Sequence, residues 1–396
     1  MLTMLDNAFQ NRSVFVTGHT GFKGAWLCMW LARLGARVTG YALEPPTAPS
    51  LFEVARVREM LVDHHVADVR DTARLTEAIR TAQPDVVLHL AAQSIVRRGY
   101  REPHETFSVN VMGTASVLEA VRTLGRPTSV VCVTSDKCYE NREQPWGYRE
   151  NDAFGDHDPY GGSKGAAELV VRSYRDSFFH ADRVEQHGVR LASARAGNVI
   201  GGGDWTPDAL LVDIVRSLSQ NEPALIRSPH AFRPWQHVLQ ALSGYLMLAA
   251  KLLNDDEPML CSGWNFGPLP GSEIPVREVV EQFLAHWGDG QWVDGSDPHA
   301  MREANILRLC IDKALWQLHW KPCWSTPQTL ARTADWYRRW LNDDEDMQQV
   351  SLEQIEAYEQ AMRRVAGEED DGENNLQHRM LNTAPTAALS NKSLSR

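Results

Sequence analysis

Residues 14–24 read Val-Phe-Val-Thr-Gly-His-Thr-Gly-Phe-Lys-Gly, an apolar run that leads into a glycine-rich turn and then into a helical pattern. In Gly-x-x-Gly-x-x-Gly the missing side chains let the backbone turn tightly and approach a pyrophosphate, which binds the N–H groups at the helix start. Three glycines alone also fit a structural turn, but here a strand and a helix flank them in the required order. The stretch predicts a dinucleotide site formed by Gly18, Gly21, Phe22, Lys23 and Gly24.

The alternation of strand and helix continues through the first half of the chain. Apolar runs predict strands at residues 14–17, 37–42, 64–66, 86–90, 129–134 and 189–194. Helical periodicity predicts helices at residues 25–34, 72–81, 106–124 and 163–179. This order is typical of an α/β protein with a Rossmann-type, doubly wound parallel sheet. The unbroken apolar run at residues 86–90 indicates a strand buried on both faces.

The composition changes after Arg195, where glycine, proline and tryptophan become frequent. We expect a dinucleotide-binding domain with the catalytic groups at residues 1–195 and a smaller substrate-binding lobe at residues 196–345. Helical patterns at residues 325–342 and 352–365 predict two further helices, and a C-terminal helical segment is expected at residues 346–366. Residues 367–396 are polar, first acidic and then rich in Ser, Thr, Ala and Asn, so we expect disorder there.

Bulk properties exclude several classes of protein. A hydrophobic content of 43% with 23% charged residues is typical of soluble globular proteins. The net charge of −11 disfavours a nucleic-acid surface, which needs a basic patch. No apolar run reaches the ~18 residues of a membrane span, and no leader pattern is present. The six cysteines form no Cys-x-x-Cys pair and no cluster with histidine, so we expect no metal, free thiols and a cytoplasmic protein.

The choice between NAD and NADP depends on the tip of the second strand. An acid there binds the ribose of NAD, whereas arginine accommodates the 2′-phosphate of NADP. Residues 40–44 read Gly-Tyr-Ala-Leu-Glu, with only a late acid at Glu44 and no arginine cluster, which favours NAD. Asp68 and Val69 end the third strand. Asp68 either accepts a hydrogen bond from the adenine amine or caps the helix expected at residues 72–81.

Five residues predict a catalytic centre. Tyr160 and Lys164 lie four apart and share one face of a helix, where the ammonium favours phenolate and lowers a pKa of ~10 towards neutrality. Such a phenolate can take a proton from an alcohol. Ser135, Asp136 and Lys137 follow a central strand at its carboxyl end, where ligands bind in doubly wound sheets. Separately, the two groups also fit a turn and a surface helix; together they indicate an active site in which several protons move.

These motifs carry a resemblance to the extended short-chain dehydrogenase/reductase family of nucleotide-sugar enzymes, over about residues 10–340. It rests on the glycine-rich turn, the catalytic segments, Leu90-Ala91-Ala92-Gln93 and residues 195–201. Within that family the chain resembles the 4,6-dehydratases that act on CDP-glucose. The narrower resemblance rests on residues 21–27, 134–139, 201–205, 233–238 and 303–305.

The resemblance implies an internal redox cycle with tightly held NAD. Hydride leaves the sugar at C4, water is lost across C5–C6, and hydride returns at C6 to leave a 4-keto-6-deoxy sugar. It implies that Tyr160 is the base at the C4 hydroxyl, that Lys164 holds the cofactor ribose and that Ser135 hydrogen-bonds the reacting oxygen. Asp136 is assigned as the acid and Lys137 as the base of the elimination, and the sequence leaves their order open because related dehydratases carry Asp-Glu here.

The resemblance also implies binding residues outside this group. Those for the cofactor are Leu90, Ala91, Ala92, Gln93 and Asn110, the last of which is expected to bend its helix or to bond its backbone. Those for the substrate are Asn198, Gly203, Trp205, Arg233, Trp235, Gln236, His237 and Asn305. Trp235 also fits core packing. Arg97 and Arg98 fit either a diphosphate contact or a solvated loop.

Two departures from the family pattern concern the substrate. Relatives usually carry an arginine near Ala209, and Arg216 is one candidate to replace it. The stretch after Leu309 also lacks a usual aspartate.

Three functions therefore stay open. The first is a CDP-glucose 4,6-dehydratase. The second is a 4,6-dehydratase or 4-epimerase acting on GDP-mannose, dTDP-glucose or a UDP-sugar, and the Asp136-Lys137 pair favours dehydration. The third is a non-catalytic NAD-binding sensor, which the intact Ser135, Tyr160 and Lys164 disfavour. The apolar helix at residues 106–124 and the Tyr160 helix predict a homodimer or a dimer of dimers, with no membrane or nucleic-acid partner.

Overall fold

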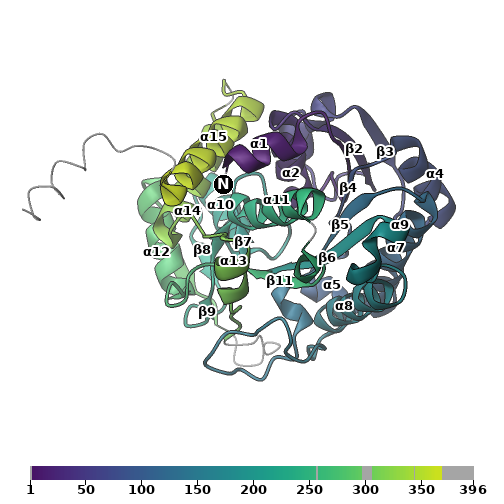
Figure 1. The fold of residues 1–396 in the computed structure, drawn as a ribbon. Helices are drawn as coiled ribbons and strands as arrows, with labels where there is room; N and C mark the ends of the chain where they lie inside the picture. The colour runs from purple at the N-terminus through teal and green to yellow at the C-terminus, as the bar shows by residue number, and fades with distance from the viewer. Residues whose placement is uncertain (1, 256, 297–305, 343, 368–396) are drawn as a thin grey trace, which may run out of the picture.

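The computed structural model, shown in Figure 1, describes residues 2–255, 257–296, 306–342 and 344–367. At its centre lies a seven-stranded sheet in the order β11-β6-β5-β4-β1-β2-β3, in which every pairing is parallel. The strands are β1 (Ser13–Thr17), β2 (Arg37–Ala42), β3 (Asp63–Val66), β4 (Val86–His89), β5 (Thr128–Val133), β6 (Val189–Ala196) and β11 (Gly263–Phe266). The predicted Rossmann-type doubly wound sheet is confirmed.

Helices cover both faces of this sheet. One face carries α4 (Thr72–Ala82), α7 (Gly113–Leu124) and α8 (Pro159–Ser177). The other carries α1 (Leu2–Phe9), α2 (Phe22–Arg33), α11 (Val238–Asn254) and α15 (Met347–Ala366). Along β4, Val86 and Leu88 join the core beneath α2 and α11, whereas Val87 joins the core beneath α7. Burial on both faces explains why this strand carries consecutive rather than alternating apolar residues.

Short helices connect the first half of the sheet. They are α3 (Leu51–Val54), α5 (Val96–Arg101), α6 (Pro103–Phe107) and α9 (Val184–His187), with 3-10 turns at Val57–Met60, Asp136–Cys138 and Ala181–Arg183.

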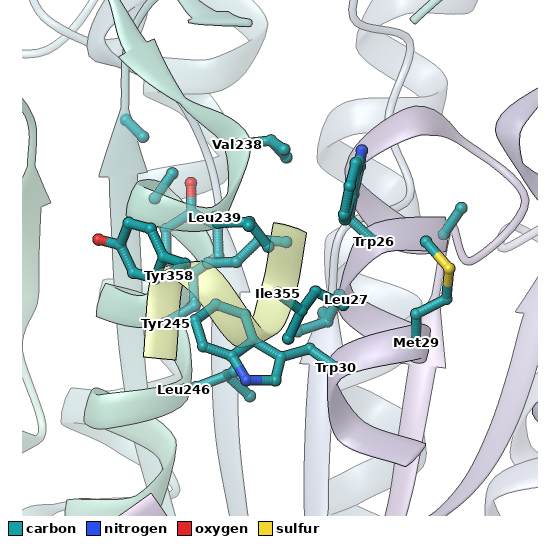
Figure 2. Packing of buried hydrophobic residues seen from close by; sticks show 14 of the residues in the cluster. Trp26, Leu27, Met29, Trp30, Val238, Leu239, Tyr245, Leu246, Ile355 and Tyr358 are labelled. Atoms are coloured by element: carbon teal, nitrogen blue, oxygen red, sulfur yellow. The ribbon is translucent and has the colours of Figure 1, made fainter. Parts of the chain in front are cut away.

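The sequence interpretation missed α11 and β11. Helix α11 is buried almost all round, as expected of a helix that is apolar on every side. Figure 2 shows it beside α2 and α15, with Trp30 directed towards Leu246 and packed edge-on against Tyr358 at 5.7 Å between ring centroids. Strand β11 pairs with β6, so the chain returns to the main sheet after residue 196. The expected domain division at residue 195 does not coincide with the end of the sheet.

The smaller lobe is built from three two-stranded pairs and further helices. The pairs are β7 (Val199–Ile200) with β10 (Gln236–His237), β8 (Ala224–Ile226) with β13 (Trp292–Asp294), and β9 (Phe232–Arg233) with β12 (Ile274–Pro275). The helices are α10 (Leu210–Ser219), α12 (Val276–Trp287), α13 (Asp312–Gln317) and α14 (Thr326–Trp340), with a 3-10 turn at Pro258–Leu260. Helices α14 and α15 correspond to the two predicted near the C-terminus.

Within the described ranges, no helix combines the length and apolar character that a membrane crossing requires. The disorder predicted for residues 367–396 concerns a segment that, except for Gly367, lies outside the described residues.

Candidate active site

The parallel strands β1, β4, β5 and β6 end at the same edge of the sheet, towards the smaller lobe (Figure 1). The glycine-rich turn, residues 90–93 and residues 134–137 therefore meet at this edge. This is the place where ligands bind in doubly wound folds.

The geometry of the glycine-rich turn fits a dinucleotide. Gly18 has a φ of +76°, and a Cβ on it would lie 2.7 Å from the backbone nitrogen of Ala91. A Cβ on Gly24 would lie 2.1 Å from the carbonyl oxygen of Gly18. Gly21 is the N-cap of α2, and no side chain caps this helix start. The first N–H groups of α2 are thus left for a pyrophosphate, with Phe22 and Lys23 in the first turn.

A buried histidine, His19, lies within the glycine-rich turn and packs against β2 and β3. His19 Nε2 lies 2.6 Å from His64 Nδ1 on β3, and burial lowers the pKa of His19 to about 3, so the ring is neutral. A Cβ on Gly40 of β2 would lie 2.4 Å from the His19 ring. The glycine at position 40 is therefore required by packing under the turn.

At the tips of β2 and β3, one prediction is corrected. Helix α4 is capped by Asp71, whose Oδ1 accepts from the backbone N–H of Arg74, so the alternative that Asp68 is the cap is wrong. Asp68 instead accepts two hydrogen bonds from the Arg70 guanidinium, at 2.9 Å and 2.6 Å, and these hold the pKa of Asp68 below its usual value. The proposed adenine contact of Asp68, like the binding role of its buried neighbour Val69, stays a prediction.

The loop after β4 is held to both neighbouring elements. The backbone N–H groups of Leu90 and Ala91 each donate to Thr17 Oγ1 at 3.2 Å, and Ala92 continues the loop. The Gln93 side chain is buried and bonds within the loop and to α6. These contacts fix the loop beside the glycine-rich turn.

Asn110 lies in a π-helical segment, Ser108–Met112, that separates α6 from α7. The continuous helix predicted at residues 106–124 is thus interrupted, as is common at functional sites. Asn110 Nδ2 donates to the Gln93 carbonyl oxygen at 3.0 Å and to Ser163 Oγ on α8 at 2.8 Å. The distorted segment joins the β4 loop to the helix that carries Tyr160.

Helix α8 begins four residues earlier than predicted. Asp158 is its N-cap, and Oδ1 accepts from the backbone N–H groups of Tyr160 at 2.8 Å and Gly161 at 3.0 Å. Pro159 and the following glycines read as helix breakers, whereas an aspartate cap followed by proline favours a helix start. A Cβ on Gly161 would lie 2.8 Å from the Lys137 carbonyl oxygen, so the glycine lets α8 approach the catalytic turn.

Tyr160 and Lys164 are both buried on α8. Burial raises the pKa of Tyr160 above its usual value, and a hydrogen bond with Ser135 opposes this shift. Burial, with the charge of Lys23, lowers the pKa of Lys164 to about 8. The expected lowering of the Tyr160 pKa towards neutrality is not found in this arrangement, because desolvation of the buried phenol is the largest influence on it.

Ser135 is the N-cap of the 3-10 turn Asp136–Cys138, which contains Asp136 and Lys137 and follows β5 closely. Asp136 Oδ1 accepts from Ser135 Oγ and from the Lys137 backbone N–H, both at 2.9 Å. Burial raises the pKa of Asp136, so this carboxyl keeps its proton to a higher pH than an ordinary aspartate. Lys137 is half-buried in the wall of an adjacent cavity.

This cavity has a volume of about 380 Å³ and lies between the catalytic turn and the smaller lobe. Of the residues predicted to contact substrate, it is lined by Asn198, Arg233 and Trp235. Its wall thus brings an arginine and an aromatic ring into the same cavity as Asp136 and Lys137. Among the described residues, no group of three or more His, Cys, Asp or Glu side chains could hold a metal ion.

Other residues predicted to contact substrate lie in the core instead. Gln236 is buried, and Nε2 donates to the carbonyl oxygens of Gly197 and Phe266. His237 caps α11, and its ring packs edge-on against Trp324, where burial lowers its pKa to about 3. Gln236 also lines a second cavity of about 300 Å³, and the predicted substrate contacts of both residues stay predictions.

The glycine and aromatic residues before α10 also pack against the core. Trp205 is buried edge-on against Trp336 and Tyr337 of α14. A Cβ on Gly203 would lie 2.7 Å from Leu51, so close packing requires a glycine here, and the predicted substrate contacts of Gly203 and Trp205 stay predictions. Asn305 lies outside the described residues.

The sequence interpretation missed Asp204 and Arg227 in the cavity wall, whereas Arg97 was one of its candidates for a diphosphate contact. Asp204 lines the cavity, and burial raises the pKa of its carboxyl. Arg97 and Arg227 line it from opposite lobes. Arg216, the candidate replacement for the missing arginine, donates to the Trp205 carbonyl oxygen at 2.8 Å and does not line the cavity. Only the absence of arginine at position 209 signalled that another cation was needed.

Comparison with known proteins gives the family. A family model described as GDP-mannose 4,6 dehydratase matches residues 15–184. The chain is 48% identical to CDP-glucose 4,6-dehydratase of Salmonella typhimurium over 365 residues, which cover 91% of this chain and all of the relative. It is 30% identical to a GDP-mannose 4,6-dehydratase of Vibrio cholerae, over 78% of this chain and 90% of the relative. The chain belongs to the family of nucleotide-sugar 4,6-dehydratases.

Solved structures share the fold at lower identity. The dTDP-glucose 4,6-dehydratase DesIV of Streptomyces venezuelae, with NAD and TYD bound, matches with a TM-score of 0.69 and 22% identity, over 84% of this chain and 99% of its own. A UDP-glucuronic acid 4-epimerase of Bacillus cereus, in complex with UDP-glucuronic acid and NAD, matches with a TM-score of 0.71 and 19% identity, over 83% and 99%. At these identities the likeness shows the fold alone.

Proposed function

We propose that the protein catalyses the NAD-dependent dehydration of CDP-D-glucose to CDP-4-keto-6-deoxy-D-glucose. The observation that carries this proposal is the placement of Asp136 and Lys137 in the wall of one cavity, next to Ser135 and Tyr160, in a chain 48% identical to a CDP-glucose 4,6-dehydratase along its length. A 4-epimerase needs no acid–base pair for elimination, so this placement favours dehydration.

NAD, held by the glycine-rich turn, supplies the acceptor for hydride from C4 and its return to C6. Tyr160 takes the proton of the C4 hydroxyl, and Ser135 shares that hydrogen bond. Lys164 lies one turn along α8 and binds hydroxyl groups of the cofactor. Asp136, whose pKa burial raises, gives a proton to the departing C6 hydroxyl. Lys137 takes the proton from C5.

The substrate and the two elimination roles can be tested together. The protein is incubated with CDP-glucose, GDP-mannose, dTDP-glucose and UDP-glucose, and the alkali-induced absorbance of a 4-keto-6-deoxy sugar is measured. We expect product from CDP-glucose. Asp136→Asn and Lys137→Met should slow dehydration by about 10²–10⁴-fold while reduced cofactor accumulates, because each removes one proton-transfer group after the oxidation.

Turnover of another nucleotide sugar without turnover of CDP-glucose would replace the proposed substrate. Unimpaired dehydration in both variants would refute the two roles. An epimerised product with no keto sugar would point to the 4-epimerase alternative.

We also propose a homodimer formed through α8 and its neighbours. Four large apolar side chains on α6, on the π-helical segment, on α8 and at its C-cap are exposed, and they are Phe107, Met112, Leu169 and Phe178. These elements pack side by side, so the four residues lie on adjacent surfaces. We place the dimer in the cytoplasm, since all six cysteines are free.

Leu169→Glu on α8 is expected to convert the dimer into a monomer, because it puts a charge into an apolar interface. Size-exclusion chromatography with light scattering measures the mass. Val62→Glu is the matched control, since Val62 is equally exposed but lies at the opposite edge of the sheet. Dissociation in both variants, or in neither, would contradict this interface.

A further inference from the structure

Two arginines from opposite lobes share one carboxylate at the cavity wall. Arg97, on α5, and Arg227, directly after β8, each donate through Nη1 to Asp208 Oδ1, at 3.2 Å and 3.0 Å. Arg227 Nη2 also donates to the Asp208 carbonyl oxygen at 3.2 Å and to Asp213 Oδ2 at 3.2 Å. All four residues line the 380 Å³ cavity.

The backbone presents Asp208 at the start of a helix. Asp208 has a φ of +66°, a left-handed conformation that is uncommon outside glycine. It lies two residues before α10, whose N-cap Ala209 makes no side-chain capping hydrogen bond. A carboxylate of the chain itself is thus held among the features that bind an anion, namely two guanidinium groups and an uncapped helix start.

The solvent exposure of these ion pairs indicates that another anion can replace the Asp208 carboxylate. Asp208, Arg97 and Arg227 are 35%, 43% and 37% exposed, so their pairs are screened by solvent and each contributes little. The Glu168–Arg195 pair, by contrast, is 3% exposed on both sides and is fixed. A diphosphate brings more negative charge and more acceptor oxygens to the same arginines than one carboxylate can.

We propose that Asp208 is an internal competitor of the substrate: its carboxylate pairs with Arg97 and Arg227 in the free protein, and the diphosphate of the nucleotide sugar displaces it from these arginines. Binding then requires the turn at residues 206–209 to move, and ligands with fewer phosphate charges displace Asp208 less well. Asp208 thereby sets the preference for a nucleoside diphosphate over a monophosphate. The inference rests on the proposed function, and it assigns to Arg227 and Arg97 the role that Arg216 does not fill.

The test measures the binding of CDP, CMP and inorganic pyrophosphate by isothermal titration calorimetry at low salt. In Asp208→Asn, which keeps the shape and tolerates the left-handed backbone, we expect the Kd of CDP and pyrophosphate to fall by about three- to tenfold, with a smaller change for CMP. Asp208→Gly should give the same direction without backbone strain. Arg227→Gln should weaken CDP and pyrophosphate binding, and Arg97→Gln should reduce the gain from Asp208→Asn.

Glu77→Gln is the control, because it removes the same unit of charge from an exposed pair on α4, far from the cavity. A weaker or unchanged Kd for CDP and pyrophosphate in both Asp208 variants would overturn the proposal, since Asp208 would then only hold the arginines in place. Tighter pyrophosphate binding in these variants, with no cytidine nucleotide bound by any form, would support the competition and refute the nucleotide assignment instead.

Discussion

Tyr160→Phe is expected to lower the rate of dehydration by about 10²–10⁴-fold, because it removes the group that takes the proton of the C4 hydroxyl. The ring stays, so no cavity opens in the packing around α8. The Ser135 hydroxyl loses a partner, but its contact with Asp136 is kept. Steady-state kinetics with CDP-glucose measure the loss, and the NAD content of the purified variant and its thermal midpoint should stay near those of the unchanged protein.

Tyr245→Phe is the matched control for this prediction. Tyr245 is fully buried on α11, and its hydroxyl has no hydrogen-bond partner among the described residues. Removing that hydroxyl leaves no group unsatisfied, so stability should be unchanged, and activity should fall far less than in Tyr160→Phe. Equal losses in both variants would mean that the Tyr160 effect is structural, and retained activity in Tyr160→Phe would exclude it as the base.

Glu168→Gln is expected to lower the free energy of unfolding by about 3–5 kcal/mol, because it leaves the Arg195 guanidinium buried without its charge partner. The two residues are joined by bonds of 2.9 Å and 2.8 Å, and Glu168 also accepts from Thr134 and Ser193. Arg195 lies over the Tyr139 ring. The carboxylate thus fixes α8, one turn beyond Lys164, to β5 and β6. Denaturant unfolding measures the change.

Two comparisons make this second prediction specific. Glu77→Gln, in the exposed pair with Arg80, should change the free energy of unfolding by about 0–1 kcal/mol. The double variant Glu168→Gln/Arg195→Met should recover part of the loss, because no charge is then left unpaired. A loss equal to that of Glu77→Gln would contradict the assigned role.

The contribution of the Glu168 carboxylate to stability is lost at low pH. Burial alone raises the pKa of Glu168, but Arg195, Thr134 and Ser193 reverse the shift and hold it below its usual value. The stability from this carboxylate is therefore present above its unfolded pKa and is lost as the pH falls through the lowered folded value. The Glu168→Gln variant should lack this acid-sensitive part of the unfolding profile.

The sheet and the catalytic group could be predicted from the sequence because both follow from local patterns. Strands such as β4 and β5 carry apolar runs, and Tyr160 and Lys164 are placed by helix geometry alone. Helix α11 and β11 could not be predicted in the same way, since their positions depend on contacts with α2 and β6, far away in the chain.

The contacts of the residues predicted to bind substrate could not be assigned from local sequence patterns. His237 and Trp205 belong to motifs that mark the family, but a motif does not say whether a side chain faces a ligand or the core. Their packing against Trp324 and Trp336 is a property of the tertiary structure, which the motif alone does not contain. The sequence did not indicate the ion pairs of Asp208 for the same reason. Its two partners, Arg97 and Arg227, lie 111 and 19 positions away from it along the chain.

The return of the chain to the sheet through β11 limits how the molecule can move. One hydrophobic core runs from Leu5 to Met362 and includes residues of both lobes. A hinge between the lobes would have to open this core, so nucleotide entry must rely on short surface turns such as residues 206–209. The same continuity means that cofactor-binding and substrate-binding parts unfold in one cooperative step, and that a fragment ending at residue 195 would expose the apolar face of α2.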